Sequence, residues 1–205
     1  MPITSSPLFS SSSTRLAVRR LGHALALSGL LALSPVTQAA TTPDSSNVPI
    51  PQLAPRPEDV ASIDGLMRAF YAVVNVRPDQ PRQWGRDRTL YSPWVRFVAT
   101  SIGADGQPRA RVWTHQEFVN ATEPLVQQGF AEREIHRRTR VYGAIAHVDS
   151  TYETELVGPE GLLRSRGVNS IEMLFDGQRW WITHVMWMSE SPQAPIPAEL
   201  LPARP

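Results

Sequence analysis

The sequence contains no cysteine and no lysine, so all 20 basic residues among its 205 residues are arginine. The absence of cysteine excludes disulfide scaffolds, zinc–thiolate sites, iron–sulfur clusters and a cysteine nucleophile. The absence of lysine excludes Schiff-base chemistry and a P-loop phosphate site. The formal charge of +1 argues against a strongly basic nucleic-acid-binding protein. The hydrophobic content of 41% and charged content of 19% are those of a globular protein.

Residues 1–39 have the three-part layout of a secretory signal. Arginines precede an apolar run over 21–33, and small residues suited to cleavage follow at Ala39 or Ala40. The run is about 13 residues long, short of the roughly 20 needed to span a bilayer, although an uncleaved membrane anchor is the alternative. We therefore predict export, to the periplasm or the medium, and no membrane association after cleavage.

Two proline-rich segments bracket the rest of the chain. Residues 40–57 and 191–205 each contain five prolines, and we predict a linker and a loose tail there. The region between them, 58–190, is predicted to be one domain. Without residues 1–39 the chain has 17 arginines against 19 acidic residues, which makes a nucleic-acid partner still less suitable.

The domain is predicted to begin with helices and to end with strands. Apolar residues recur every three or four positions from Glu58 to about Asn75, and a shorter helix is expected over 81–91. Thr114 and Glu117 form a capping box that opens a third helix. From Phe130 onward one strand follows another, so the fold class is α+β with an antiparallel sheet.

Two predicted turns fix which side chains share a face of that sheet. Asp176-Gly177 is typical of a two-residue hairpin, which pairs Phe175 with Gln178. A second turn pairs Gly158 with Gly161. Paired residues share a face, and faces alternate along a strand. The two registers together place five candidate pocket residues on the inner face: Ser150, Tyr152, Asn169, His184 and Met186.

The same registers define the outer face of the sheet. His147, Asp149 and Glu153 fall on it as solvated residues, so we expect no metal site. An apolar patch on an outer face suggests a partner, and we predict a homodimer through this one. The alternative is cover by the second helix or the C-terminal tail. The patch comprises Leu174, Trp181, Val185 and Trp187.

The order of these elements resembles the nuclear transport factor 2-like superfamily, in an exported bacterial subgroup of its SnoaL-like branch. The segments that carry the resemblance are 130–135, 142–153, 166–171 and 176–182, which ends in Asp-Gly-Gln-Arg-Trp-Trp-Ile. The resemblance implies a cone, in which a strongly curved antiparallel sheet wraps around three N-terminal helices and leaves a pocket at the open end. Its members include isomerases, dehydratases, polyketide cyclases and non-enzymatic binding or association modules.

The enzymes of this superfamily usually place an Asp or His acid–base, often with a Tyr, on the pocket wall. His184 is the candidate general acid or base, with a core histidine bonded to Asn169 as the alternative. Tyr152 would polarise a carbonyl or orient the ligand, and Asn169 would bind a ligand carbonyl or support His184. If the preceding hairpin turns at residues 142–143, Arg133 faces Tyr152 and suits a ligand carboxylate.

Two functions therefore remain open. The first is an exported domain that binds a small apolar or partly polar molecule, without a cofactor or metal, and that catalyses proton transfer such as isomerisation or dehydration. The second is a non-enzymatic binding or dimerisation module that uses the outer face.

Overall fold

The computed structural model describes residues 46–76, 80–126, 129–158 and 161–203. The predicted signal, residues 1–39, lies outside the described residues. None of the helices in the described part is long and apolar enough to cross a membrane.

Helices account for much of the first half of the domain. The helix predicted over 58–75 is two helices, because Ser62 adopts an extended backbone conformation and its hydroxyl accepts a hydrogen bond from the Gly65 amide at 3.0 Å. A serine in this role begins a new helix rather than continuing the old one. The helices are α1 (Pro57–Val60), α2 (Ile63–Val74), α3 (Trp84–Arg88), α4 (His115–Val126) and the 3₁₀ turn η1 (Ala198–Leu200).

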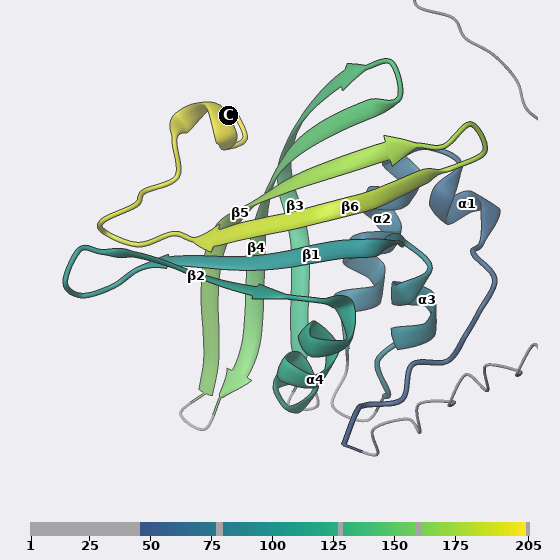
Figure 1. Ribbon diagram of the computed structural model, residues 1–205. Coiled ribbons are helices and arrows are strands. Elements are labelled where there is room, and N and C mark those ends of the chain that lie inside the picture. The colour runs from purple at the N-terminus through teal and green to yellow at the C-terminus, as the bar shows by residue number, and fades with distance from the viewer. Residues whose placement is uncertain (1–45, 77–79, 127–128, 159–160, 204–205) are drawn as a thin grey trace, which may run out of the picture. The chain divides into compact units, whose positions relative to one another are not determined.

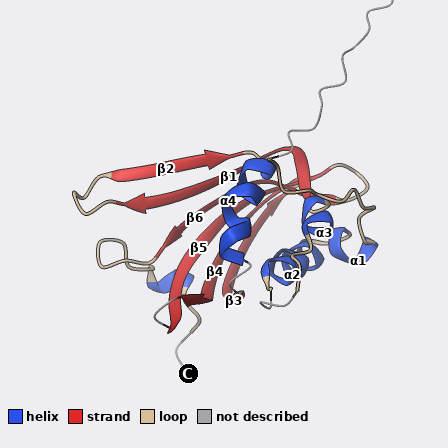
Figure 2. Ribbon diagram, turned by 90° about the horizontal axis from the view of Figure 1, so that it is seen from below, coloured by secondary structure: helices blue, strands red, loops and turns tan. Residues whose placement is uncertain are grey.

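The strands form one curved, unclosed sheet in the order β2-β1-β6-β5-β4-β3 (Figure 1). Neighbouring strands are antiparallel except β1 and β6, which are parallel. The four α-helices lie along one side of the sheet (Figure 2), which confirms the predicted α+β cone. The strands are β1 (Tyr91–Ile102), β2 (Pro108–Trp113), β3 (Phe130–Tyr142), β4 (Ile145–Gly158), β5 (Gly161–Phe175) and β6 (Trp180–Ser189).

The core lies between α2 and the inner face of the sheet. Each large apolar side chain buried there stabilises the fold by about 1.5–3 kcal/mol. The apolar face of α2 therefore covers part of the inner face of the sheet. The buried set includes Leu66, Met67, Phe70 and Val73 from α2, and Val148, Ile171, Ile182 and Val185 from the sheet.

The predicted β4–β5 register is confirmed along the whole ladder. Gly158 pairs with Gly161, and Ser150 pairs with Asn169. The tip of this turn, residues 159–160, lies outside the described residues. The register places Ser150, Asn169 and Tyr152 inside, where each is buried.

The predicted β5–β6 register is wrong, first because the connection is longer than two residues. Phe175 pairs with Trp180 rather than with Gln178. The Asp176 carboxylate accepts hydrogen bonds from the backbone amides of Gln178 and Arg179, at 2.8 and 2.9 Å. This side chain therefore stabilises a four-residue turn in place of the tighter hairpin.

A β-bulge then changes the face of the remaining residues of β6. The register shifts between Glu172 and Met173, so that Glu172 lies opposite His184 and Asn169 opposite Trp187. One extra residue in a strand reverses the faces of the side chains beyond it.

The predicted dimer patch is consequently not formed. Val185 is only 2% exposed within the core, and Trp187 packs against the core and stacks on Trp113. Leu174 and Trp181 do pair on the outer face. The predicted dimer surface of all four residues is therefore wrong, because Val185 and Trp187 face inward.

The described parts of both proline-rich segments pack on the domain. The Val48 amide and carbonyl bond to Asn120 and Gln116 of α4, each at 3.0 Å. At the other end, the Leu200 carbonyl in η1 accepts a hydrogen bond from Thr151, which is fully buried on the outer face of β4. The tail thus covers part of the outer face.

Candidate functional site

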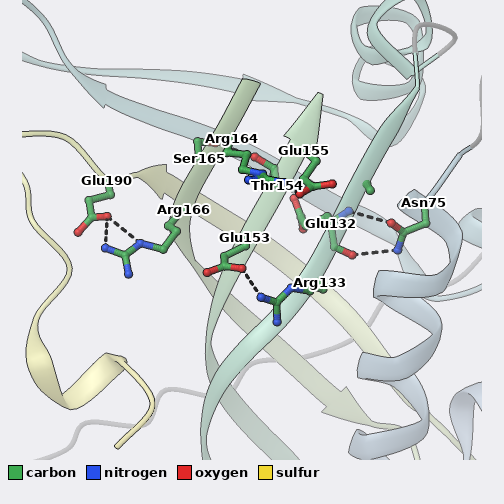
Figure 3. A pocket seen from close by; sticks show the side chains of 11 residues that line it. Asn75, Glu132, Arg133, Glu153, Thr154, Glu155, Arg164, Ser165, Arg166 and Glu190 are labelled. Atoms are coloured by element: carbon green, nitrogen blue, oxygen red, sulfur yellow. Dashed lines mark hydrogen bonds and ion pairs between the residues drawn. The ribbon is translucent and has the colours of Figure 1, made fainter. Parts of the chain in front are cut away.

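A pocket of about 990 Å³ opens at one end of the sheet, beyond the last residue of α2. Strands β3, β4 and β5 line it, together with Asn75 and Glu190 (Figure 3). Its volume is within the range of small-molecule sites. Ion pairs join its charged lining: Arg133 with Glu153, Arg164 with Glu155, and Arg166 with Glu190.

Asn75 fixes the backbone of β3 at the pocket wall. Its amide donates to the Glu132 carbonyl at 2.9 Å and accepts from the Glu132 amide at 2.8 Å. The same amino group also donates to the Tyr71 carbonyl at 2.6 Å. The C-terminal cap of α2 therefore acts as a hydrogen-bonding partner for the edge strand and holds Glu132 in place.

Glu132 is the acid that best fits a chemical role in this pocket. Burial raises the pKa of its carboxyl to about 7, and the opposing effects of Arg82 and a hydrogen bond from Asn169 lower it only in part. Both protonation states are therefore populated at neutral pH, as general acid–base catalysis requires. Figure 3 shows this residue beside Asn75 at the pocket wall.

Two hydroxyls lie next to Glu132 on the same face. Thr154 pairs with Glu132 across β3–β4, and Ser165 pairs with Thr154 across β4–β5. The two hydroxyl oxygens are 2.6 Å apart. One of their two protons is used between them, so the other can be donated to an oxygen of a bound molecule.

Behind Glu132 lies a cluster of buried polar side chains. The Tyr71 hydroxyl is 2.6 Å from the Ser150 hydroxyl and 3.3 Å from the Asn169 amino nitrogen. The Ser150 hydroxyl donates to Glu134 at 2.5 Å. Burial raises the pKa of Tyr71 well above its ordinary value, so the phenol stays neutral and can donate.

Tyr152 lies inside as predicted, although its hydroxyl is not beside the pocket acid. It is 3.5 Å from the Ser189 hydroxyl, and burial raises its pKa to about 12. Its ring covers Gly167, where a Cβ atom would come within 2.3 Å of the phenol oxygen. Tyr152 therefore packs as a neutral side chain.

The structure brings three predicted site residues together and separates three others. Ser150, Tyr152 and Asn169 share the buried inner face. His184 lies on the outer face opposite Glu172, so its predicted contact with Asn169 is wrong.

Met186 and Arg133 also leave the inner face, although Arg133 still lines the pocket. Met186 lies opposite Ser170 and is 39% exposed. Arg133 lies opposite Glu153 and forms an exposed ion pair with it, because the hairpin turns one residue later than expected and a bulge follows. Glu134 occupies the position opposite Tyr152 that was predicted for Arg133.

Sequence reasoning missed Tyr71 and the two glutamates of β3. Tyr71 had a usable signal, since it lies four residues after Met67 and three before Val74 on the apolar face of α2. Glu132 and Glu134 alternate with alanine and arginine, which is also the pattern of a solvated strand.

The sequence matches no protein-family model and no curated protein. Among solved structures, a protein of Novosphingobium aromaticivorans assigned as the beta subunit of an aromatic-ring-hydroxylating dioxygenase aligns with a TM-score of 0.50 and 11% identity, over 66% of this chain and 95% of that one. A protein of Kribbella flavida gives 0.50 and 11%, over 64% and 90%. A calcium/calmodulin-dependent protein kinase II association domain assigned in Xanthomonas campestris gives 0.48 and 14%, over 71% and 95%.

The comparisons support the fold only. The domain shares its fold with these solved structures, and this fold is the α+β curved-sheet fold that the resemblance implied. At these identities the likeness carries no ligand or reaction to this chain.

Proposed function

We propose that the protein binds a small carbonyl compound in its pocket and that Glu132 transfers a proton to or from the carbon next to the carbonyl. The observation that carries this is a pocket-lining carboxyl whose pKa is raised to about 7 by burial. Glu132 replaces His184 in the acid–base role. We also propose that the protein acts outside the cytoplasm, which the predicted signal segment supports. Its membership of the SnoaL-like branch remains part of the proposal and rests on the sequence resemblance.

The groups around Glu132 suit this chemistry. Removing a proton beside a carbonyl places negative charge on the carbonyl oxygen, and a positioned donor must stabilise that charge. The Thr154–Ser165 hydroxyl pair offers such a donor on the same face as Glu132. A hydrogen bond from Asn169 favours the ionised form of the carboxyl. Proton removal, and its return to a different carbon, would constitute an isomerisation.

The test follows exchange of α-protons for deuterium in D₂O by proton NMR, with a panel of small cyclic and linear ketones. The unaltered protein should accelerate exchange of at least one ketone, with a rate that rises as the pH passes through about 7. Glu132→Gln should lower that rate by about 100-fold or more, because the amide cannot accept the proton.

A matched control is Glu172→Gln, which changes the same functional group on the outer face of the sheet. It should leave the exchange rate unchanged. The proposal is rejected if no ketone exchanges faster than in buffer, or if Glu132→Gln exchanges as fast as the unaltered protein.

A further inference from the structure

The buried cluster behind Glu132 is a chain of hydrogen bonds that ends on a carboxylate. Arg137 donates to both oxygens of Glu134, at 2.6–3.0 Å, and Glu134 accepts from Ser150. Beyond Ser150 the chain continues through Tyr71 to the amide of Asn169. All of these contacts lie between α2 and strands β3, β4 and β5.

The number of available protons requires every hydrogen bond of this network to run in the same direction, toward Glu134. An arginine-paired carboxylate only accepts, so Ser150 donates its single proton to Glu134. Ser150 must then accept from Tyr71, whose own proton is thereby used. The Tyr71 oxygen can only accept from Asn169, which must present its amino group rather than its carbonyl.

The amide orientation matters because the same amide meets Glu132. The contact between Asn169 and Glu132 favours the ionised carboxyl, as expected when the amino group donates to it. A reversed amide would bring its carbonyl oxygen to the carboxylate, and two acceptors would then face each other.

We propose that Glu134 is a positioning residue for Glu132: acting through Ser150 and Tyr71, it holds the Asn169 amide with its amino group toward the pocket acid. The inference rests on the proposed function in assigning Glu132 as the acid–base. Glu134 itself does not contact the bound molecule. It acts only by fixing which group donates in each hydrogen bond between it and Asn169.

The test measures the titration of the Glu132 carboxyl by carbon-13 NMR in the intact protein, with its resonance assigned by its loss in Glu132→Gln. Tyr71→Phe and Ser150→Ala break the chain without changing any charge. Each should raise the Glu132 midpoint above its value of about 7 by about 0.5 to 1 pH unit, since the amide loses its fixed orientation.

Glu134→Gln gives a sign that separates positioning from a simple field effect. Loss of a nearby negative charge would by itself lower the Glu132 midpoint. Loss of positioning raises it, so we expect a rise in this variant as well. The matched control is Asp64→Asn, which removes the exposed carboxylate on the far side of Arg137 and should leave the midpoint unchanged.

The result that overturns the inference is an unchanged or lowered Glu132 midpoint in both Tyr71→Phe and Ser150→Ala, with backbone spectra that show folded protein. If the unaltered protein still exchanges ketone protons in that case, the proposed function stands without the positioning chain. If the midpoints shift as expected but no ketone is turned over, the chain stands and the proposed function falls.

Discussion

The Nε2 atom of His115 lies 2.7 Å from an oxygen of Asp87, and Asp87 is fully buried. The Arg82 guanidinium, also buried, approaches the other oxygen of Asp87 at 4.0 Å and stacks over the Trp84 ring. None of the three polar side chains belongs to the pocket lining, although Arg82 is close enough to Glu132 to lower its pKa. Asp87 thus links α3 to the start of α4.

We expect Asp87→Asn to lower the free energy of unfolding by about 3–5 kcal/mol, because it leaves the buried Arg82 charge without its counter-ion. Urea denaturation followed by circular dichroism measures this change. The control is Asp105→Asn, whose partner Arg109 is largely exposed, and which should cost less than about 1 kcal/mol. Equal losses in the two variants would contradict a structural role for the buried cluster.

Glu132 is expected to reduce stability at the pH where it would work. Its pKa in the folded protein, about 7, lies above its ordinary value of 4.5, because burial disfavours the charged form. The destabilisation therefore begins as the pH rises above about 4.5 and is complete above about 7. Glu132→Gln should raise the free energy of unfolding at pH 8 by about 3 kcal/mol and change it little at pH 4. A destabilised variant at pH 8 would mean that the carboxyl is needed for the fold itself.

The outer face offers a second, independent pH dependence at His147. Burial lowers the pKa of this imidazole. Hydrogen bonds to Glu172 at 2.7 Å and to Asp149 at 2.9 Å raise the pKa by more than burial lowers it, so the net shift is upward. The protonated form therefore stabilises the fold below the ordinary pKa of 6.5, and this contribution is lost as the pH rises through the higher folded value.

His147→Gln tests this dependence. The variant should be less stable than the unaltered protein at pH 6, and the difference should shrink by pH 9, as measured by urea denaturation at each pH. A difference that stays constant across this range would show that the imidazole contributes through packing rather than charge.

The inner face could be predicted from the sequence as far as the β4–β5 turn determines it. Ser150, Tyr152 and Asn169 depend only on that turn, and all three lie inside. His184 depends on the next turn and on the strand after it. The Asp176 side chain lengthens that turn, and the bulge beside Glu172 adds a residue, so the error reaches every position beyond.

The pocket acid could not be found in the same way, for a physical reason. On strands, alternating glutamate and arginine is typical of a solvated face, and nothing local separates Glu132 from Arg133. What distinguishes Glu132 is a pair of hydrogen bonds between its backbone and the side chain of Asn75, which lies 57 residues earlier in the chain at the end of α2. Contacts of that range depend on how the helix packs on the sheet.

Gly167 is the position at which the inner face tolerates no side chain. A Cβ atom there would lie 2.3 Å from the Tyr152 hydroxyl oxygen and 2.6 Å from the Met188 carbonyl oxygen, and the second of these is backbone. Because Tyr152 could move but the β6 backbone could not without breaking the ladder, Gly167→Ala should cost about 1–3 kcal/mol of unfolding free energy. Tyr152→Leu in the same chain should recover only part of that loss, since the clash with the Met188 carbonyl remains. Thermal denaturation of the single and double variants measures both effects. The control is Gly158→Ala, where the nearest contact of the added Cβ atom is the flexible Leu163 side chain at 3.2 Å. Full recovery in the double variant would show that the tyrosine ring alone excludes a side chain at this position.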